Sequence, residues 1–265
     1  MNVAMARDQG RINADSSECC QYLSWDSRHF GLRIGRVTNA RLTESSIEEI
    51  SQWTRDNAID CLYFLADPDP ATLRLAMEAG FRFVDIRTTL EVSLDEPPPE
   101  RTFDVRLARR EDVNNLRRIA GRSHHGSRFY SDGNFAQQLC DELYRIWIER
   151  SCLDSGFASE VLVVERQAHV LGYVTYRLSS TLAEIGLVGI DQDFRGQGLG
   201  KLLLGAAVRR MQERGAETAR VITQGTNVPA LRLYQRFGFR PVSVGLWYHL
   251  WGTRHPEARG GEILL

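Results

Sequence analysis

The sequence lacks the patterns that mark a metal site, a membrane span or a nucleic-acid-binding surface. Its five cysteines contain no C-x-x-C pair and its six histidines contain no ligand pair, so we expect no metal and a reducing compartment. No apolar run approaches the roughly 18 residues that a membrane-spanning helix needs. The net charge of −1 lacks the basic excess typical of nucleic-acid-binding proteins. These absences predict a soluble, cytoplasmic protein that binds neither membrane nor nucleic acid.

The composition that is present, 43% apolar and 25% charged residues, is that of an ordinary globular protein. At 265 residues we expect two domains, and the stretch DEPPPER at 95–101 sets prolines between charges, as a semi-rigid connector does. The first residues have no apolar signal-peptide core and are expected to form a flexible tail. The predicted organisation is a tail at 1–20, an accessory domain at 21–95, a linker at 96–102, a larger domain carrying the chemistry at 103–253, and a second tail at 254–265.

Hydrophobic periodicity predicts a mixed α and β fold in which most strands are antiparallel. In the helix expected at 43–57, Ile47, Ile50 and Trp53 recur at helical spacing behind a capping Thr43 or Ser45. The other helices are expected at 110–123, 135–152, about 200–215 and 229–239. The strands are expected at 22–26, 61–67, 104–109, 160–167, 170–180, 183–191, 218–224 and 243–251.

One short pattern occurs on both sides of the linker. The stretch at 73–82 has Leu-Arg-Leu, four residues, then Gly-Phe-Arg, and the stretch at 231–240 repeats it, with an apolar strand following each time. Chance similarity between two glycine-ended helices is the alternative to duplication. The first copy has Ala76 where the second has Tyr234, and no arginine-glycine cluster precedes it. A duplication therefore predicts that the accessory domain is a truncated, degenerate relative of the larger one.

Residues 193–203, DFRGQGLGKLL, place three glycines at alternate positions before an apolar helical run. The G-x-G-x-G spacing does not fit the G-x-G-x-x-G of dinucleotide-binding folds, and Lys201 is followed by Leu202 instead of the Ser or Thr of a P-loop. Glycines that turn backbone N–H groups inward beside a helix N-terminus form an anion site suited to a pyrophosphate. A flexible connector between a strand and a helix is the other explanation.

The segment RGQGLG at 195–200 resembles the Arg/Gln-x-x-Gly-x-Gly/Ala signature of the GCN5-related N-acetyltransferase (GNAT) family. As in that family, it lies between an apolar strand ending in an acid, GLVGID at 186–191, and an apolar helix. Asn227 with LRLYQRFGF at 231–239 resembles the family's second motif, in which an Asn and a Tyr face the coenzyme thiol. The resemblance covers about 105–251 and implies the GNAT fold, a mostly antiparallel sheet flanked by helices. It also implies acetyl-CoA as co-substrate, an N-acetyltransferase activity and no metal.

The resemblance further implies which residues contact the coenzyme. Main-chain groups of one strand, at Leu187, Val188, Gly189 and Ile190, would face the acetyl and pantetheine part, with Asn227 near the thiol. The loop residues Arg195, Gly196, Gln197, Gly198, Leu199, Gly200 and Lys201 would hold the pyrophosphate. Backbone N–H groups freed where the strand at 183–191 parts from its neighbour would polarise the thioester carbonyl, as an oxyanion site does.

Acetyl transfer to an amine also needs a group that returns a proton to the leaving thiolate. Tyr234 is the candidate general acid, because a phenol with an ordinary pKa near 10 can protonate a thiolate. The other interpretation is a tyrosine that only packs on the sheet. Glu184, at the start of the coenzyme strand, is the candidate general base, with a solvated surface carboxylate as the alternative.

Four further segments, at 25–37, 127–130, 144–152 and 223–227, are similar to GNAT enzymes that acetylate the 4-amino group of a TDP-linked 4-amino-4,6-dideoxy-galactose. This likeness implies a nucleotide-sugar acceptor in polysaccharide biosynthesis, bound by Arg128 and Tyr130 of the loop at 121–132. Arg128 would pair with the sugar diphosphate, whereas a solvated arginine is the alternative. A different small-molecule amine or protein N-terminus as acceptor, a non-catalytic acyl-CoA sensor, and a homodimer all stay open.

Overall fold

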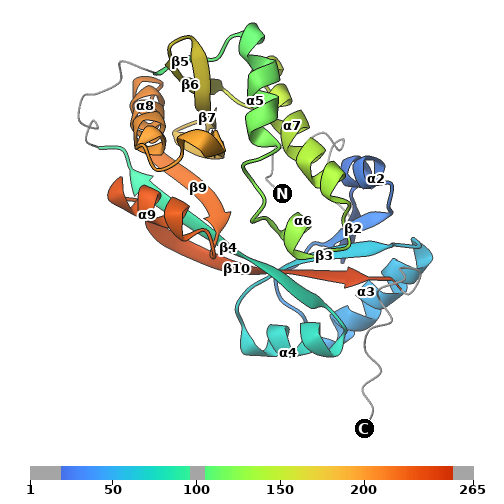
Figure 1. Cartoon of the computed structure of the whole chain (residues 1–265). Helices are drawn as coiled ribbons and strands as arrows, with labels where there is room; N and C mark the ends of the chain where they lie inside the picture. The colour runs from blue at the N-terminus through green and yellow to red at the C-terminus, as the bar shows by residue number, and fades with distance from the viewer. Residues whose placement is uncertain (1–18, 96–104, 253–265) are drawn as a thin grey trace. The chain divides into compact units, whose positions relative to one another are not determined.

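The computed structural model of the protein describes residues 19–95 and 105–252 (Figure 1). The chain divides into two compact units, and neither is one continuous stretch. The described parts of the first unit are 19–87, 128–136 and 244–252, and those of the second are 88–95, 105–127 and 137–243. The predicted linker at 96–102, the tail at 254–265 and nearly all of the tail at 1–20 lie outside the described residues.

The first unit pairs three strands from the start of the chain with one from its end. β1 (Cys20–Tyr22) is antiparallel to β2 (Ile34–Val37), and β2 is parallel to β3 (Cys61–Ala66). β3 is antiparallel to the second half of β10 (Arg240–Trp251), where Ala66 is opposite Leu246 and Cys61 is opposite Trp251. The helices of the unit are α2 (Ser24–Phe30), α3 (Glu44–Asp56), α4 (Pro70–Glu78) and the short α6 (Arg128–Ser131).

Local signals explain most of these elements. The Thr43 side chain accepts a hydrogen bond from the backbone N–H of Ser46, so Thr43 is the N-cap of α3. The strand predicted at 22–26 is wrong, because the strand ends at Tyr22 and α2 begins at Ser24. Gly31 closes this helix in the left-handed region, at φ 67°. A seven-residue helix shows too few turns for its apolar spacing to stand out in the sequence.

The second unit has a largely antiparallel run of strands. Antiparallel pairs join β5 (Val105–Leu107) to β6 (Glu160–Arg166), β6 to β7 (His169–Ser179), and β7 to β8 (Leu182–Ile190). β8 is parallel to β9 (Thr218–Gln224). In Figure 1 these strands lie between α8 (Leu199–Glu213) on one side and α5 (Val113–Ala120) and α7 (Gln137–Leu153) on the other. The unit also contains α9 (Val228–Arg236) and the 3-10 turns Arg110–Asp112 and Gln192–Phe194.

The segment repeated in the sequence has the same local structure both times. α4 and α9 each carry a proline in their first turn and begin at a side-chain cap, Asp69 in one case and Asn227 in the other. Each is followed by a glycine at φ 83°, Gly80 or Gly238, and then by a long strand, β4 (Arg82–Ser93) or β10. The likeness of the two halves therefore extends from sequence to helix caps and turn geometry.

The mixed α and β class with mostly antiparallel pairing is confirmed, and the helices and strands predicted beyond residue 40 agree with the observed ones to within a few residues. The described residues include no helix that is both long enough and apolar enough to cross a membrane. A core of Tyr176, Leu203, Val221 and Phe239 among others lies between α8, α9 and the strands of the second unit, and it supports the candidate site.

Candidate functional site

A β-bulge in β8 marks the centre of the candidate site. Between the pairs Val174/Val188 and Tyr176/Ile185, the two residues Gly186 and Leu187 lie opposite the single residue Thr175. The Leu187 N–H donates to Oγ1 of the buried Thr175 at 2.9 Å. Gly186 makes this contact possible, since a Cβ at that position would lie 2.8 Å from the same oxygen.

Past the bulge, β8 separates from β9. The parallel pairing runs from Leu182/Thr218 to Ile185/Val221 and stops there, although β8 continues to Ile190 and β9 to Gln224. The bulge also reverses which side chains face the core, because Ala183 and Ile185 face it before the bulge and Val188 and Ile190 pack against it afterwards. The parallel pairing with β9 thus does not extend to residues 186–190.

The three glycines of the loop after β8 have different physical roles. Gly196 and Gly198 adopt φ of 77° and 78°, a region that other residues enter only with strain. Gly198 is the N-cap of α8, so no side chain competes for the first N–H groups of that helix. Gly200 lets α9 approach, since a Cβ there would lie 3.3 Å from Cδ2 of Leu233. The loop therefore has a defined shape, which argues against a plain flexible connector.

Polar contacts hold the start of this loop. Arg118 forms an ion pair with the buried Asp191 at the end of β8. Burial raises the pKa of Asp191, but the hydrogen bond from Arg118 and the backbone N–H of Asp193 outweigh it and leave the pKa below its usual range. Arg195 reaches back to the carbonyls of Ile190 and Arg122, at 3.3 Å each. Gln197 and Lys201 are exposed beside the N-terminal end of α8, whereas Leu199 is buried under it.

α9 brings the second motif into the same unit. The Asn227 side chain accepts from the N–H of Ala230 at 3.2 Å and so caps α9. Tyr234 is 4% exposed and its ring lies 5.8 Å from that of Phe239. Burial raises the pKa of the Tyr234 phenol well above its usual range, so the hydroxyl keeps its proton at neutral pH.

Glu184 lies before the bulge, at the other end of β8 from the glycine loop. It is half-buried, and its register partners are Arg177 on β7 and Arg220 on β9. Cross-strand partners point to the same face of a sheet, so two arginines flank this carboxylate. Arg220 itself donates to Glu91 of β4 at 2.6 Å.

The two residues predicted to bind the acceptor lie in the first unit, on α6. Tyr130 is half-buried there. Arg128 is 2% exposed, and its Nη1 lies 2.7 Å from Nε2 of His249. Its guanidinium also lies over the rings of Tyr63 and Trp247, 4.1 and 4.4 Å from their centroids. The structure thus places Arg128 inside the first unit and not on a solvent-facing loop.

A second buried ion accompanies Arg128 in this unit. Asp26 is 1% exposed, and neither carboxylate oxygen has a hydrogen-bond partner among the residues described. Burial raises the pKa of Asp26 to about 6, and the positive charge of Arg128 partly opposes that rise. A buried carboxylate without hydrogen bonds is costly, so Asp26 is expected to lower the stability of the fold.

Two features of the site have no signature in a single sequence. Thr175 is one polar residue within an apolar strand, and its role at the bulge follows only from the register of β7 with β8. Tyr173 lies beneath Gly189, where a Cβ would come within 2.6 Å of the ring, and its hydroxyl is 3.1 Å from Nε2 of His124. Burial lowers the pKa of His124 to about 3, so its imidazole is neutral. Within the described ranges no three His, Cys, Asp or Glu side chains gather into a metal-binding group.

Comparisons with known proteins agree with this geometry. Residues 124–239 match the profile of the Acetyltransferase (GNAT) family, which spans the bulge, the glycine loop and α9. Over 157 residues the chain is 24% identical to the spore coat polysaccharide biosynthesis protein SpsD of Bacillus subtilis, covering 59% of this chain and 53% of that protein. It is 37% identical over 67 residues to the mycothiol acetyltransferase of Saccharomonospora viridis, covering 25% of this chain and 22% of that protein. The chain thus aligns with about half or less of these two proteins.

A shorter relative is covered more fully. A Bacillus subtilis protein named as a ribosomal protein bS18-alanine N-acetyltransferase is 26% identical over 145 residues, covering 55% of this chain and 85% of that protein. Its name mentions an alanine of a ribosomal protein, whereas the name of the Saccharomonospora viridis relative mentions mycothiol. Two of the three names therefore state an acetyltransferase, and these two differ in the molecule that they mention.

Solved structures extend the likeness to most of the chain. A conserved protein of unknown function from Staphylococcus epidermidis superposes with a TM-score of 0.63 at 17% identity, over 92% of this chain and 95% of that one. A GCN5-related N-acetyltransferase from Sphaerobacter thermophilus superposes with a TM-score of 0.61 at 17% identity, over 88% and 76%. The chain therefore has the GNAT fold, and its residues 124–239, less than half of its length, are similar to the acetyltransferase (GNAT) family.

Proposed function

We propose that the protein is an acetyl-CoA-dependent N-acetyltransferase. The observation that carries this proposal is the open edge of β8 beside a glycine loop whose helix has no side-chain cap. A pyrophosphate fits the loop, because helix N-termini and inward-turned N–H groups bind phosphates. An extended amide-containing chain such as pantetheine fits the open strand edge, because it can make the hydrogen bonds that β9 leaves unused.

The assignment of coenzyme contacts follows the two parts of this site. Backbone groups of Leu187, Val188, Gly189 and Ile190 bind the pantetheine and acetyl part in the proposal, and Val188 polarises the thioester carbonyl. The pyrophosphate is bound in the proposal by the backbone N–H groups of Gly196, Gly198, Gly200 and Lys201. The shape of the loop and of the start of α9 around the pyrophosphate is held in the proposal by Arg195, Gln197, Leu199 and Asn227.

The proposed reaction is direct attack within a complex of both substrates. The acceptor amine attacks the thioester carbonyl, a C–N bond forms, the C–S bond breaks, and the amine loses a proton. Tyr234 gives its phenolic proton to the departing thiolate. For the base we retain Glu184, which acts through water in this proposal because it lies before the bulge.

For the acceptor we propose a TDP-linked 4-amino-4,6-dideoxy sugar, which places the protein in polysaccharide biosynthesis. The likeness to a spore coat polysaccharide biosynthesis protein supports this acceptor. The likeness to an alanine N-acetyltransferase supports a protein N-terminus as the second candidate. Tyr130 remains a substrate-binding residue in the proposal. Arg128 is reassigned from diphosphate ligand to anchor of the loop at 121–132, since its guanidinium is buried against His249.

We also propose that the first half of the chain, the accessory domain at 21–95, is a non-catalytic relative of the second. The equivalent of Tyr234 is the fully buried Ala76, and the described residues before α4, 19–69, contain no counterpart of the glycine loop. Calorimetry should then find one acetyl-CoA site per chain. Two sites of similar affinity would refute this part of the proposal.

The deciding experiment offers acetyl-CoA with three classes of acceptor and follows release of the coenzyme thiol. The panel contains TDP- and UDP-linked amino sugars, peptides with an N-terminal alanine, and small free amines. Turnover of a TDP-amino sugar at least about a hundredfold above the others in kcat/KM is the expected result. A higher kcat/KM for the peptide would indicate that the acceptor is a protein N-terminus, the second candidate. Binding of acetyl-CoA without turnover of any acceptor would favour an acyl-CoA sensor.

A further inference from the structure

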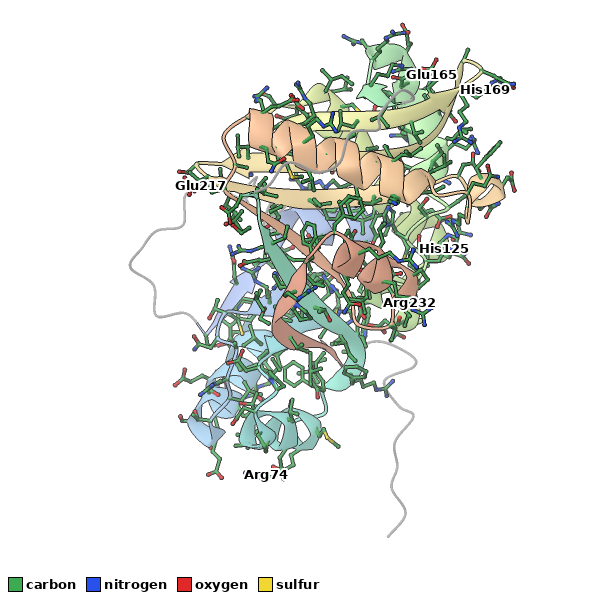
Figure 2. All side chains as sticks on the ribbon, turned by 90° about the vertical axis from the view of Figure 1, so that its left-hand side faces the viewer. Arg74, His125, Glu165, His169, Glu217 and Arg232 are labelled. Atoms are coloured by element: carbon green, nitrogen blue, oxygen red, sulfur yellow. The ribbon has the colours of Figure 1, made fainter. Side chains whose placement is uncertain are left out.

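The β8 bulge lies in the interior of two long strands, where it cannot relax by fraying. Cross-strand pairs hold β7 to β8 on both sides of the bulge. Figure 2 marks the two ends of these strands, because His169 begins β7 and Glu217 lies just before β9, and the two residues are on opposite sides of the unit. The extra residue of the bulge therefore has to be accommodated by contacts at the bulge itself.

The hydroxyl of Thr175 supplies one of these contacts. A bulge leaves a residue of the longer strand without its partner in the ladder, and a buried N–H group without an acceptor is costly. Leu187 is 4% exposed and Thr175 is 2% exposed, and the N–H of the first donates to Oγ1 of the second at 2.9 Å. The side chain of Thr175 thus replaces the main-chain carbonyl that a regular ladder would offer.

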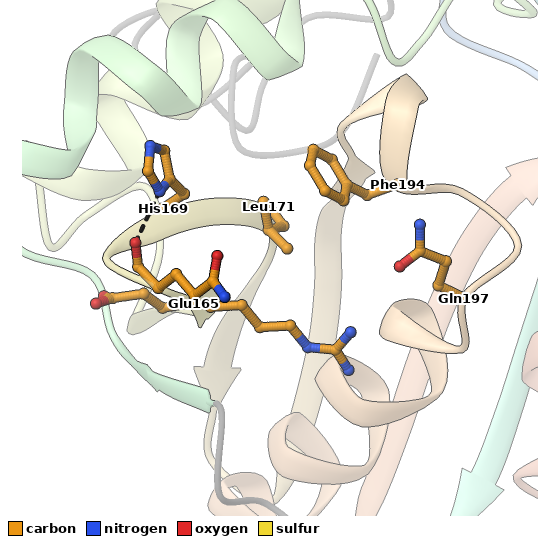
Figure 3. Close-up of a pocket in the computed structure, with 7 residues that line it drawn as sticks. Glu165, His169, Leu171, Phe194 and Gln197 are labelled. Atoms are coloured by element: carbon orange, nitrogen blue, oxygen red, sulfur yellow. Dashed lines mark hydrogen bonds between the residues drawn. The ribbon is translucent and has the colours of Figure 1, made fainter.

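Two hydrogen bonds show which way the backbone of β8 faces after the bulge. The Leu187 N–H points to β7, and the N–H of Asp191, just after β8, donates to the Leu171 carbonyl of β7 at 2.8 Å. Leu171 also lines the hollow beside the glycine loop (Figure 3). Successive N–H groups of a strand point to alternate sides, so those of Val188 and Ile190 point away from β7. This is the side on which the pairing with β9 has stopped.

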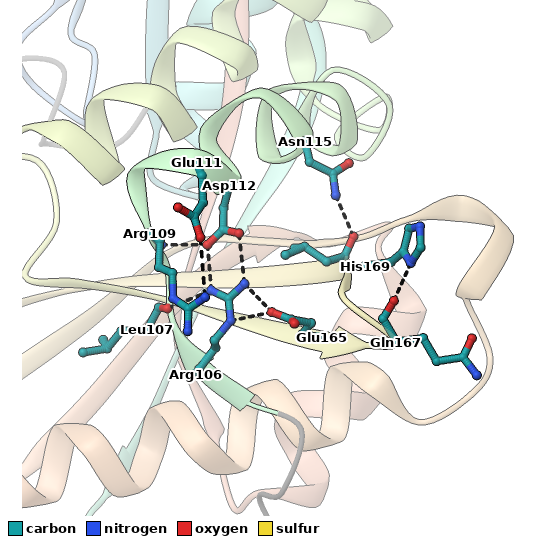
Figure 4. A network of polar contacts seen from close by, with 10 residues as sticks. Arg106, Leu107, Arg109, Glu111, Asp112, Asn115, Glu165, Gln167 and His169 are labelled. Carbon is teal, nitrogen blue, oxygen red and sulfur yellow. Dashed lines mark hydrogen bonds and ion pairs between the residues drawn. The ribbon is translucent and has the colours of Figure 1, made fainter.

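β7 is itself held in place where it faces the bulge and the end of β8. Asn115 of α5 donates to the Val170 carbonyl at 3.0 Å, at the start of β7 (Figure 4). The Tyr173 ring lies beneath Gly189, where a Cβ would come within 2.6 Å of it. The Tyr173 hydroxyl lies 3.1 Å from Nε2 of His124. The strand that carries the bulge acceptor is thus fixed at two points close to that acceptor.

We propose that Thr175 is a positioning residue for acetyl transfer. The inference rests on the proposed function, in which Val188 polarises the thioester carbonyl. By accepting from the Leu187 N–H, Thr175 fixes the alternation that turns the next N–H, that of Val188, toward the coenzyme. Without the hydroxyl, the Leu187 N–H has no acceptor at the bulge, and the backbone that carries the Val188 N–H can turn to find one. Thr175 acts through this backbone and does not touch the substrate.

The first test replaces the hydroxyl by a methyl group. Thr175→Val keeps the shape of the side chain and should lower kcat by up to about 10²-fold, as a misplacement of about 1 Å does. The KM of acetyl-CoA should change little, because the pyrophosphate loop is untouched. Thr175→Ser keeps the hydroxyl and should restore most of kcat.

Thr72 of the first unit provides a matched control. It is fully buried, and its Oγ1 accepts from the Leu42 N–H at 3.2 Å, which is the same kind of contact. Thr72→Val and Thr175→Val should both lower Tm by several degrees, because each leaves a buried N–H group without its acceptor. Only Thr175→Val should lower the kcat of the folded protein. A purely structural role of Thr175 predicts instead that both variants keep the wild-type kcat.

A binding measurement tests the same inference without any acceptor. The probes are the ketone analogue of acetyl-CoA, in which CH2 replaces the sulfur, and S-ethyl-coenzyme A, in which CH2 replaces the carbonyl. Calorimetry on the full chain should show that the wild type binds the ketone more tightly by about three- to tenfold, the usual worth of a hydrogen bond. Thr175→Val should lose this preference, and Thr175→Ser and Thr72→Val should keep it.

The inference is overturned if Thr175→Val keeps the wild-type kcat and the preference for the ketone, or if Thr175→Ser fails to restore them. Thr175→Ala removes the same acceptor without adding a methyl group, and it replaces the valine variant if that protein does not fold. Failure of both to fold would assign Thr175 to stability alone and overturn the inference. If the wild type binds neither probe, the proposed function itself fails.

Discussion

Nη1 of Arg128 lies 2.7 Å from Nε2 of His249, although 121 residues separate them in the sequence. Nδ1 of His249 bonds to Asp132, which also accepts from the Trp251 indole at 3.0 Å and from Asn134 at 2.7 Å. The carboxylate, the neutral imidazole and the guanidinium thus form one hydrogen-bonded network in the interior of the first unit. This network links the α6 segment to β10.

The pKa of His249 in this hydrogen-bonded network predicts that the stability of the protein depends on pH. Burial, which is the largest cause, and the charge of Arg128 lower the pKa of His249 to about 4, against the opposing effect of Asp132. An unfolded histidine is protonated below about pH 6.5. The unfolded state therefore binds an extra proton between about pH 6.5 and 4, so the free energy of unfolding falls as the pH is lowered through that range.

His249→Gln should make that fall shallower, because a Gln amide can still accept from Arg128 and donate to Asp132 but does not titrate. The measurement is the free energy of unfolding by urea at several pH values from 7.5 to 4.5. His124 titrates in the same direction but is present in both proteins, so it cancels in the difference. Parallel profiles of the two proteins would show that His249 does not contribute.

The raised pKa of Asp26 predicts a pH dependence of stability opposite in sign to that of His249. Its pKa is raised to about 6 in the folded protein by burial, so the native state holds a proton that the unfolded state loses near pH 4. Stability should therefore fall as the pH rises from about 4 to 6, and Asp26→Asn should remove that loss. We expect the variant to be more stable than the wild type at pH 7.5, by on the order of 1–2 kcal/mol, and to lose this advantage near pH 4.5. An equal difference at both pH values would contradict the assignment.

The glycine loop can be tested by a matched pair of substitutions. Gly198 and Gly215 lie at opposite ends of α8 with φ of 78° and 84°, and a Cβ at either position would meet no atom within 4 Å. Valine at either site should therefore cost a similar backbone strain, on the order of 1–3 kcal/mol. Only Gly198→Val should raise the KM of acetyl-CoA, by about tenfold, with little change in the KM of the amine. Equal acetyl-CoA KM values in the two folded variants would show that the loop is only a connector and does not bind the coenzyme.

Tyr234 can be compared with a tyrosine whose hydroxyl has a structural partner. Tyr234→Phe should lower kcat by about 10²–10⁴-fold, the usual worth of a positioned general acid, with little change in Tm. Tyr176→Phe removes a hydroxyl that donates to Glu160 at 2.7 Å, and should lower stability by about 1–3 kcal/mol while kcat stays within about threefold. Both are measured at saturating amine above neutral pH. A near-normal kcat for Tyr234→Phe would remove it from the mechanism.

The parts that the sequence predicts are those fixed by local signals. The Thr43 cap, the strand at 218–224 and the glycines at the start of α8 depend on residues within one or two turns of each other. The environment of Arg128 could not be predicted, because its partners lie on α6, β3 and β10 and only the fold brings them together. The bulge at Thr175 depends on strand register, which a single sequence does not reveal.

Each unit contains segments that are far apart in the sequence, and this affects how the protein folds during synthesis. The first unit contains residues 244–252, so the strand beside β3 is synthesised long after β3 itself. Until then β3 has an unpaired edge, which is a hazard for association with other chains. The first unit should therefore depend on β10 for its completion. Cutting the chain at the linker would leave the first fragment without the strand that completes its sheet.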